Sequence, residues 1–270
     1  MRALLTSPLG LLIGVSLGAL GGGGSILAVP ALVYAAGQTP KHATTTSLVL
    51  VAITALLGII PHWRANRVRL AAGTLFGLVG IAGSLLGSHW NQAADPDLLL
   101  LAFAGLMFVA AMAMWRRTRR PEARVPARSL SSAAAAAPPG LAHPFDFAQA
   151  MKVAAAGTLV GLLTGFFGVG GGFVIVPALV LALGFTMPDA IGTSLLVITI
   201  NSLVALSTRL QTGAIEWGTV IPFTLASLIG VVIGTRLAST KDSTSLQRWF
   251  VVLLVVVATY TAVQSTVALL

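Results

Sequence analysis

Two glycine clusters interrupt some of the most apolar sequence in this chain. The first stretch, beginning at Gly18, reads GALGGGGSILAVPALV, and the second, beginning at Gly165, reads GFFGVGGGFVIVPALV. Glycine is the poorest helix former after proline, so each cluster predicts a break between two helices. The chain must therefore fold in a way that accepts broken backbone inside apolar surroundings.

The composition indicates which surroundings these are. Hydrophobic residues make up 56% of the chain and charged residues only 9%, whereas a soluble protein carries roughly 25% charged residues. A helix needs about 20 apolar residues to cross a bilayer, and most of the apolar segments are that long. They are 3–20, 25–37, 43–61, 69–89 and 97–115 in the first half, and 150–168, 172–184, 189–208, 217–237 and 246–268 in the second. We predict an all-α polytopic integral membrane protein.

The segments that directly follow the glycine clusters, 25–37 and 172–184, are too short to cross a bilayer. They are typical of half-helices or re-entrant segments, which occur at the binding sites of secondary transporters. Broken backbone within a membrane is tolerated only where it is buried in protein or lines a cavity. We therefore expect the two breaks to meet near the middle of the bilayer.

The two halves of the chain are a repeat. A shift of 147 residues superimposes the glycine clusters, Pro30 on Pro177, and Thr46-Ser47 on Thr193-Ser194, and 17 of the 35 residues at 14–48 are identical to their counterparts. This predicts a first transmembrane repeat at 1–115, a linker at 116–146 that is basic and then rich in Ala and Pro, and a second repeat at 147–270.

Charges predict how the repeats lie in the membrane. The segment 116–128 carries six arginines and one glutamate, and such segments remain in the cytoplasm. The loop with Arg64, Arg67 and Arg69 and the segment 236–248 are basic as well, while the loop HWNQAADPD has only acidic charges. Equivalent loops then lie on opposite faces, which predicts inverted-topology repeats with both termini outside the cytoplasm. Five crossings per half, or three crossings plus a re-entrant pair, both satisfy this topology.

The candidate site residues lie at the breaks and just after them. Free backbone N–H groups at the start of a half-helix attract an anion, and glycine lets the anion approach closely. Hydroxyls that recur downstream of both breaks and a mid-membrane amide are further candidates. The predicted substrate site comprises Gly21, Gly22, Gly23, Gly24, Ser25, Thr46, Ser47, Gly168, Gly170, Gly171, Gly172, Thr193, Ser194 and Asn201.

Several of these residues also have a plainer interpretation. Ser25 is a plausible N-cap, and membrane hydroxyls often bond to a backbone carbonyl of their own helix. His42 and Asp189 occupy equivalent repeat positions and are candidates for proton coupling, although Asp189 also suits a helix start. The scattered glycines, such as Gly83 and Gly230, are typical of close helix packing.

The sequence carries no sign of other chemistries. The chain has no cysteine, and His62, His89 and His143, which we expect in loops, have no partners at metal-ligand spacing. No Gly-Lys-Ser/Thr follows the glycine clusters, and no catalytic constellation is visible. The basic charges lie between apolar segments rather than in a nucleic-acid patch. We expect no enzyme activity, no cofactor, no metal and no nucleic-acid partner, and the sequence gives no signal for an oligomeric state.

The duplicated pattern resembles the TauE/SafE sulfite exporter family, also called the toluene sulfonate uptake permease family. The residues that carry the resemblance are Gly18, Gly21, Gly23, Gly24, Pro30, Ala43, Thr46 and Ser47 in the first half, and Gly165, Gly168, Gly170, Gly171, Gly172, Pro177, Ala190, Thr193 and Ser194 in the second. The resemblance implies an inner-membrane permease for sulfite, sulfonates, sulfoacetate or similar small organic anions. The first copy departs from the pattern by having Ser25 where the second has Gly172.

The sequence thus predicts a secondary transporter with an anion site between two inverted repeats. It would work by alternating access, driven by a proton or substrate gradient. A passive anion channel of the same architecture is the alternative.

Overall fold

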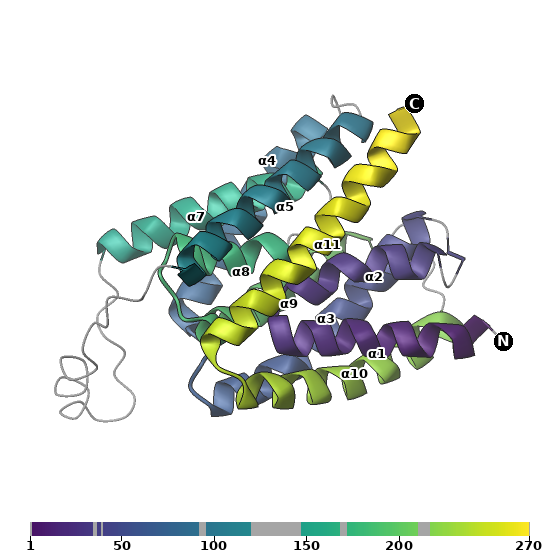
Figure 1. Ribbon diagram of the computed structural model, residues 1–270, viewed down its shortest axis with the longest axis horizontal. Coiled ribbons are helices and arrows are strands. Elements are labelled where there is room, and N and C mark those ends of the chain that lie inside the picture. Colours follow the sequence, from purple (N-terminus) through teal and green to yellow (C-terminus); the bar gives the residue numbers. More distant parts are fainter. Residues whose placement is uncertain are drawn as a thin grey trace.

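The computed structural model describes residues 2–34, 37–38, 40–91, 96–119, 147–167, 172–209 and 217–269, and these form helices and their connections. The first half contains α1 (Arg2–Leu20), α2 (Gly23–Tyr34), α3 (Pro40–Arg64), α4 (Leu70–Asn91) and α5 (Pro96–Arg119). The second half contains α7 (Phe147–Phe167), α8 (Gly172–Leu181), α9 (Met187–Arg209), α10 (Trp217–Thr240) and α11 (Ser243–Leu269) (Figure 1). The all-α prediction is confirmed. Most of the predicted linker, residues 120–146, lies outside the described residues.

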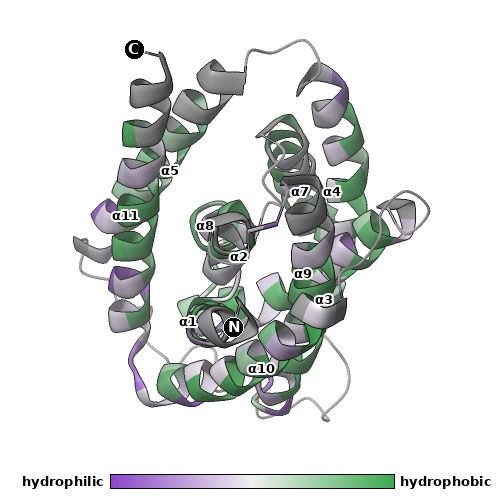
Figure 2. Cartoon of the chain, turned by 90° about the vertical axis from the view of Figure 1, so that its right-hand side faces the viewer, coloured by the Kyte–Doolittle hydropathy of each residue, from purple (hydrophilic) through white to green (hydrophobic). Residues whose placement is uncertain are grey.

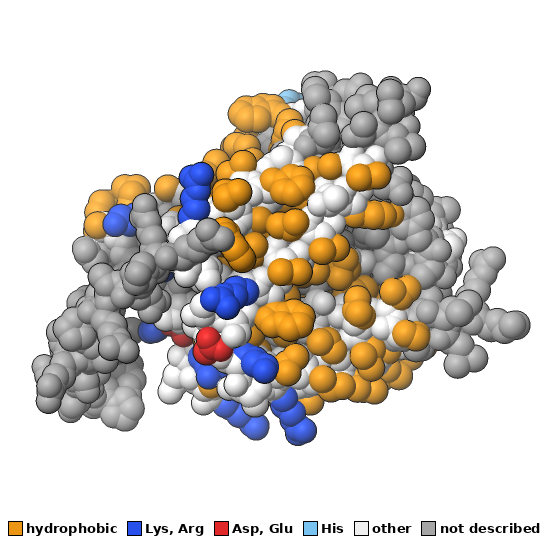
Figure 3. Space-filling view, in the orientation of Figure 1, with side chains coloured by type: hydrophobic (Ala, Val, Ile, Leu, Met, Phe, Trp, Pro, Cys, Tyr) orange, Lys and Arg blue, Asp and Glu red, His pale blue; other side chains and the backbone are white. Residues whose placement is uncertain are grey.

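The outer surface of the helices is apolar. Leu78, Leu85 and Val109 are each more than 60% exposed, and an apolar surface of this extent marks contact with a membrane. On the face shown in Figure 3, apolar side chains cover most of the described surface, and Lys and Arg side chains gather toward one end. Among the described residues, six helices are long and apolar enough to cross a membrane, namely α3, α4, α7, α9, α10 and α11. The chain is a polytopic membrane protein.

The long helices of one half pack against those of the other half. Helix α1 lies along α10, and α4 lies along α7. A Cβ added at Gly14 would collide with the carbonyl of Ser227, so the backbones approach as closely as glycine allows. The same is true of Gly83 and Gly230, so our interpretation of these scattered glycines as packing residues is confirmed.

Each of these close contacts between the halves has a counterpart in which the two halves have exchanged roles. The shift of 147 residues converts each contact of α1 with α10 into a contact of α7 with α4. The pairs are Gly10–Phe223 with Gly157–Phe76, Gly14–Ser227 with Gly161–Gly80, Gly18–Val231 with Gly165–Ser84, Leu11–Gly230 with Thr158–Gly83, and Val15–Gly234 with Leu162–Gly87. The sequence repeat is thus accompanied by a repeat of contacts.

The two short helices lie inside this arrangement. Figure 2 shows α2 and α8 in the middle, with the longer helices around them. Helix α2 doubles back beside α1, because Gly24 lies against Ile13 and Leu17 of α1. Helix α8 runs toward the C-terminal end of α5, where Arg117 donates a hydrogen bond to the carbonyl of Val180.

Both short helices end earlier than the apolar segments of the sequence predicted. Helix α2 ends at Tyr34 rather than at residue 37, and α8 ends at Leu181 rather than at residue 184. Each is followed by a glycine in the left-handed conformation, Gly37 with φ 66° and Gly184 with φ 72°. Glycine adopts this conformation readily and so terminates helices, which hydropathy alone does not register.

Candidate functional site

The first glycine cluster forms a tight turn between α1 and α2. Gly21 has φ 67°, a conformation that side-chain-bearing residues rarely adopt, and its N–H donates to the carbonyl of Leu17 at 2.9 Å. A Cβ at Gly21 would also lie 2.5 Å from the hydroxyl oxygen of Ser194 in α9. The cluster therefore reverses the chain directly against α9.

The start of α8 lies against this turn. A Cβ at Gly22 would overlap the carbonyl of Gly172, and a Cβ at Gly172 would overlap the hydroxyl of Ser25. The N-terminal ends of α2 and α8 are therefore in contact. Each of these ends presents backbone N–H groups without intrahelical partners and the positive end of a helix dipole.

Packing alone already requires glycine at the first break. A Cβ at Gly24 would meet the backbone of α1, and one at Gly23 would lie 2.9 Å from the side chain of Leu253 in α11. A bulky substitution here would therefore report on folding as much as on binding. The second cluster, with Gly168, Gly170 and Gly171, lies outside the described residues.

The interpretation of Ser25 as an N-cap is wrong. Helix α2 begins at Gly23, so Ser25 is its third residue. Its half-buried hydroxyl donates to the carbonyl of Gly22 at 2.7 Å. Gly23 and Gly24 begin the helix, and a Cβ at Gly24 would meet the backbone of Ile13 and Leu17 in α1. Ser25 therefore lines the junction of α2 and α8.

The predicted hydroxyls are buried, and the described contacts of two of them are structural. Ser194 donates to the carbonyl of Ile191 at 2.8 Å, one turn back in its own helix. Thr193 accepts a hydrogen bond of 3.1 Å from the backbone N–H of Arg69, which fixes the loop between α3 and α4 on α9. Thr46 and Ser47 are buried in α3.

The remaining predicted residues occupy different surroundings. Asn201 lies in the middle of α9, and its buried Oδ1 has no hydrogen-bond partner within the described residues. Asp189 is in the first turn of α9 and pairs with Arg69 at 3.1 Å. His42 belongs to α3, but its side chain is not described.

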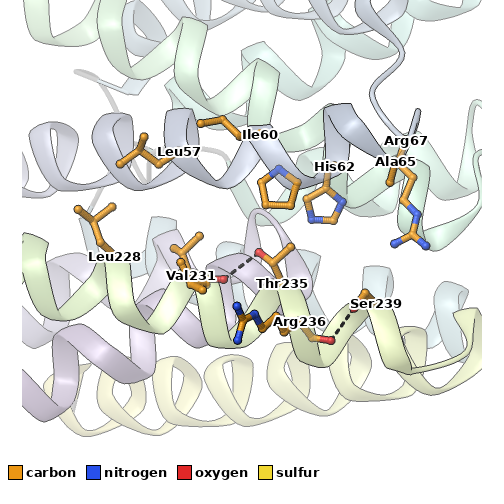
Figure 4. Close-up of a pocket in the computed structure, with 12 residues that line it drawn as sticks. Leu57, Ile60, His62, Ala65, Arg67, Leu228, Val231, Thr235, Arg236 and Ser239 are labelled. Carbon is orange, nitrogen blue, oxygen red and sulfur yellow. Dashed lines mark hydrogen bonds between the residues drawn. The ribbon is translucent and has the colours of Figure 1, made fainter.

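A pocket between α3 and α10 was not predicted from the sequence. It has a volume of about 530 Å³, and Figure 4 shows it beside the last turns of both helices, with His62 on its wall. The prediction that His62 lies in a loop is wrong, since α3 continues past Pro61 to Arg64. The sequence did carry one signal for this pocket. Arg67 follows one apolar segment and Arg236 lies near the end of another, but nothing in the sequence shows that these two segments are neighbours.

Half-helices that meet inside a polytopic helical bundle are typical of membrane transport proteins. The model of the family described as "Sulfite exporter TauE/SafE" matches residues 7–261. The chain belongs to the sulfite exporter TauE/SafE family, which is a family of membrane transporters.

The curated relatives match nearly the whole chain. A "Probable membrane transporter protein" of Xylella fastidiosa (strain 9a5c) is 35% identical over 260 residues, covering 95% of this chain and 94% of the relative. The "Probable membrane transporter protein YunE" of Bacillus subtilis (strain 168) is 24% identical over 247 residues, which is 88% of each chain. No solved structure matches the chain significantly.

Proposed function

We propose that this protein is a secondary transporter that moves small sulfur-containing or organic anions, such as sulfite, sulfonates or sulfoacetate, across the inner membrane by alternating access. The observation that carries the proposal is the contact between Gly22 and Gly172. This contact brings together two helix N-termini, and both attract negative charge. Membership of the TauE/SafE family supports the same conclusion.

The anion would be held mainly by backbone N–H groups at the starts of α2 and α8. Ser25 lies at this junction, and Ser194 faces Gly21 across it. Asn201 has a buried, unsatisfied amide oxygen, and a buried polar group without a partner costs about 1–3 kcal/mol. That oxygen gains from a hydrogen-bond donor such as the O–H of a protonated substrate, while the N–H2 group of the same amide can donate to an anion. On this ground we propose Asn201 as a side chain that contacts substrate.

The reciprocal contacts support two repeats related by a two-fold axis, and the charges at the helix ends favour opposite orientations in the membrane. Contacts that exchange the halves require an approximate two-fold relation between them. The basic ends of α3 and α10 belong to different halves, and the positive-inside rule assigns both to the cytoplasm. Because α2 doubles back beside α1, we favour three crossings plus a re-entrant pair in each half, with the linker cytoplasmic and both termini outside. Rocking of one repeat against the other would then expose the junction to each side in turn.

Proton coupling through His42 and Asp189 is part of this proposal. Asp189 already has a cationic partner in Arg69, so a proton arriving at its carboxylate would break that ion pair and leave the bond to Thr193 as the described link between this loop and α9. Transport by the Asp189→Asn and His42→Gln variants tests the idea. Unchanged pH dependence of uptake in both variants contradicts proton coupling through these residues.

The function is tested by uptake of radiolabelled sulfite and a short sulfonate into proteoliposomes, with and without a pH gradient. We expect saturable uptake by the natural protein and at least about tenfold slower uptake by Asn201→Ala, which corresponds to about 1.4 kcal/mol. Thr199→Val is the matched control, because Thr199 is a buried polar residue of the same helix whose hydroxyl is satisfied by Leu195 at 2.8 Å.

Each outcome decides a part of the proposal. Saturable flux that depends on Asn201 supports a transporter with Asn201 in its substrate site. Large unitary currents in electrical recordings favour the anion channel instead. Normal flux in Asn201→Ala removes Asn201 from the site, and no flux of any sulfur anion contradicts the proposed substrate class.

A further inference from the structure

The pocket between α3 and α10 has an apolar end and a basic end. Figure 4 shows Leu57 and Leu228 at one end, and Arg67, Arg236 and Ser239 toward the other. None of the residues that line the pocket is acidic. Neither arginine pairs with a carboxylate within the described part of the chain. The basic end therefore carries two positive charges that no carboxylate of the described residues pairs with.

His62 forms part of the inner wall of this pocket. Its side chain is 2% exposed, and neither ring nitrogen completes a hydrogen bond within the described residues, although the backbone of Gly18 lies close to the ring. A buried polar group is normally hydrogen-bonded, and an exception calls for an explanation such as a missing ligand. An oxyanion in the pocket would accept a hydrogen bond from the imidazole and face both guanidinium groups.

The wall of the pocket is continuous with the glycine break. A Cβ at Gly192 in α9 would lie 3.1 Å from the Cβ of His62. A Cβ added at Gly21 would lie 3.2 Å from the Cα of Ile191, the residue directly before Gly192. One turn of α9 therefore separates the pocket from the junction of α2 and α8.

The sequence repeat provides a counterpart at the other end of the molecule. The shift of 147 residues pairs His62 with Arg209, and Arg236 with His89. The first half thus supplies both histidines and the second half both arginines, and each pair, His62 with Arg236 and His89 with Arg209, contains one of each. With the inverted repeats proposed above, the second pair would lie at the opposite mouth of the path.

We propose that the pocket is an anion-binding antechamber, in which Arg67, Arg236 and His62 hold a small oxyanion at one mouth of the transport path before it reaches the glycine junction. Only the role of the pocket in transport rests on the proposed function, because anion binding in the pocket can be measured without any flux. Guanidinium groups near the mouth concentrate anions there, and His62 completes the site at its inner end.

Cysteine accessibility tests the proposal, since the chain has no cysteine of its own. Ser239→Cys places a single thiol in the pocket, and Thr240→Cys is the matched control on the neighbouring exposed residue. Both hydroxyls bond to a carbonyl of their own helix, at 2.7 and 2.9 Å. The full-length variants react with an anionic and with a cationic methanethiosulfonate reagent, in detergent and in vesicles with and without phosphatidylglycerol.

We expect the thiol at 239 to prefer the anionic reagent by roughly tenfold over the thiol at 240, because the guanidinium groups raise the local concentration of anions. Benzenesulfonate should protect position 239 and leave position 240 reactive. The Arg67→Gln/Arg236→Gln pair should remove both effects, and His62→Gln, which keeps a hydrogen-bond donor, should weaken binding less than His62→Leu.

Four results contradict the proposal or a part of it. Equal reactivity at the two positions shows that no anion field exists in the pocket. Protection that requires phosphatidylglycerol and does not respond to the free sulfonate assigns the pocket to a lipid headgroup. Normal protection in both His62 variants removes His62 from the site. Normal uptake without protection contradicts only the antechamber, whereas protection without uptake contradicts only the transport function.

Discussion

At the scale of single residues, the effect of replacing a glycine in these helices depends on the atom that the new Cβ would meet. Gly161 faces the carbonyl of Gly80 in α4, whereas Gly105 in α5 has nothing within 4 Å. Glycine is a poor helix former at both positions, and alanine should improve each helix by about 0.5–1 kcal/mol when nothing opposes it. This gain in helix stability is expected only where the new Cβ does not collide with a neighbouring backbone.

We therefore predict opposite effects for two alanine substitutions. Gly161→Ala forces α7 away from α4 and should lower the free energy of unfolding by about 1–3 kcal/mol, as overpacking does. Gly105→Ala should raise it by about 0.5–1 kcal/mol. Thermal unfolding of both variants in detergent measures the difference. Equal shifts of the two melting temperatures would show that α4 and α7 do not pack as closely as described.

At the scale of elements, the sequence predicted the helices well and their ends less well. The first glycine cluster located the break between α1 and α2, because a run of glycines disfavours a helix in any surroundings. The prediction for α3 stopped at Pro61, since proline usually ends a helix. The helix instead continues to Arg64, and this is why His62 was assigned to a loop and the pocket was missed.

A C-terminal capping motif explains where α3 ends. Asn66 has φ 54°, and its N–H donates to the carbonyl of Trp63 at 2.9 Å. The N–H of Arg67 donates to the carbonyl of His62, also at 2.9 Å. These two hydrogen bonds form a Schellman motif, with asparagine in the position that glycine usually takes.

This motif predicts a graded response at residue 66. Asn66→Gly should leave stability unchanged or raise it, because glycine adopts the left-handed conformation without strain. Asn66→Val should lower the free energy of unfolding by about 1–2 kcal/mol, which is the cost of that conformation for a residue with a Cβ. Thermal unfolding ranks the variants, and a valine variant as stable as the glycine variant contradicts the motif. Since the motif also positions Arg67, the valine variant should weaken anion protection at the pocket.

The start of α11 gives a pH-dependent prediction. Asp242 precedes Ser243, and the hydroxyl of Ser245 donates to its carboxylate at 2.7 Å. This hydrogen bond, with the backbone N–H of Ser245, lowers the pKa of the exposed Asp242 below its ordinary value of 3.8. A carboxylate at this position caps the helix.

A lowered pKa means that the charged form of Asp242 stabilises the folded state. Its contribution is present above pH 3.8, the value for the unfolded chain, and is lost as the pH falls through the lowered pKa. We predict that Asp242→Ala is less stable than the natural protein by a constant amount between about pH 5 and 8, and that the gap narrows under more acidic conditions. Unfolding temperatures across this range measure the gap, and a gap that widens in acid contradicts the assignment.

At the scale of the whole molecule, the repeat in the sequence has a counterpart in the packing of the helices. The shift of 147 residues, found from the glycine clusters, also relates the packing of α1 on α10 to that of α7 on α4. The antechamber could not be predicted in this way. It joins His62 and Arg236, which are far apart in the chain, and only the packing of α3 against α10 brings them to one pocket.

Inverted repeats make a prediction about sidedness. His89 in α4 and Arg236 in α10 are equivalent residues, and both are exposed near the ends of their helices. Repeats of the same orientation would place equivalent residues on one side of the membrane, whereas inverted repeats place them on opposite sides. Because the reciprocal contacts fit a two-fold axis of either direction, this experiment is needed to separate the two arrangements.

We predict that the His89→Cys thiol reacts with an impermeant reagent from outside the cell, and that the Arg236→Cys thiol reacts from the cytoplasmic side only. Labelling in intact cells and in inside-out vesicles measures this directly, and the absence of other cysteines removes background. Ser243→Cys, at the basic start of α11, is the control for the cytoplasmic side. Reaction of residues 89 and 236 from the same side contradicts inversion, and it would also place both histidine–arginine pairs at one mouth and so remove the second antechamber.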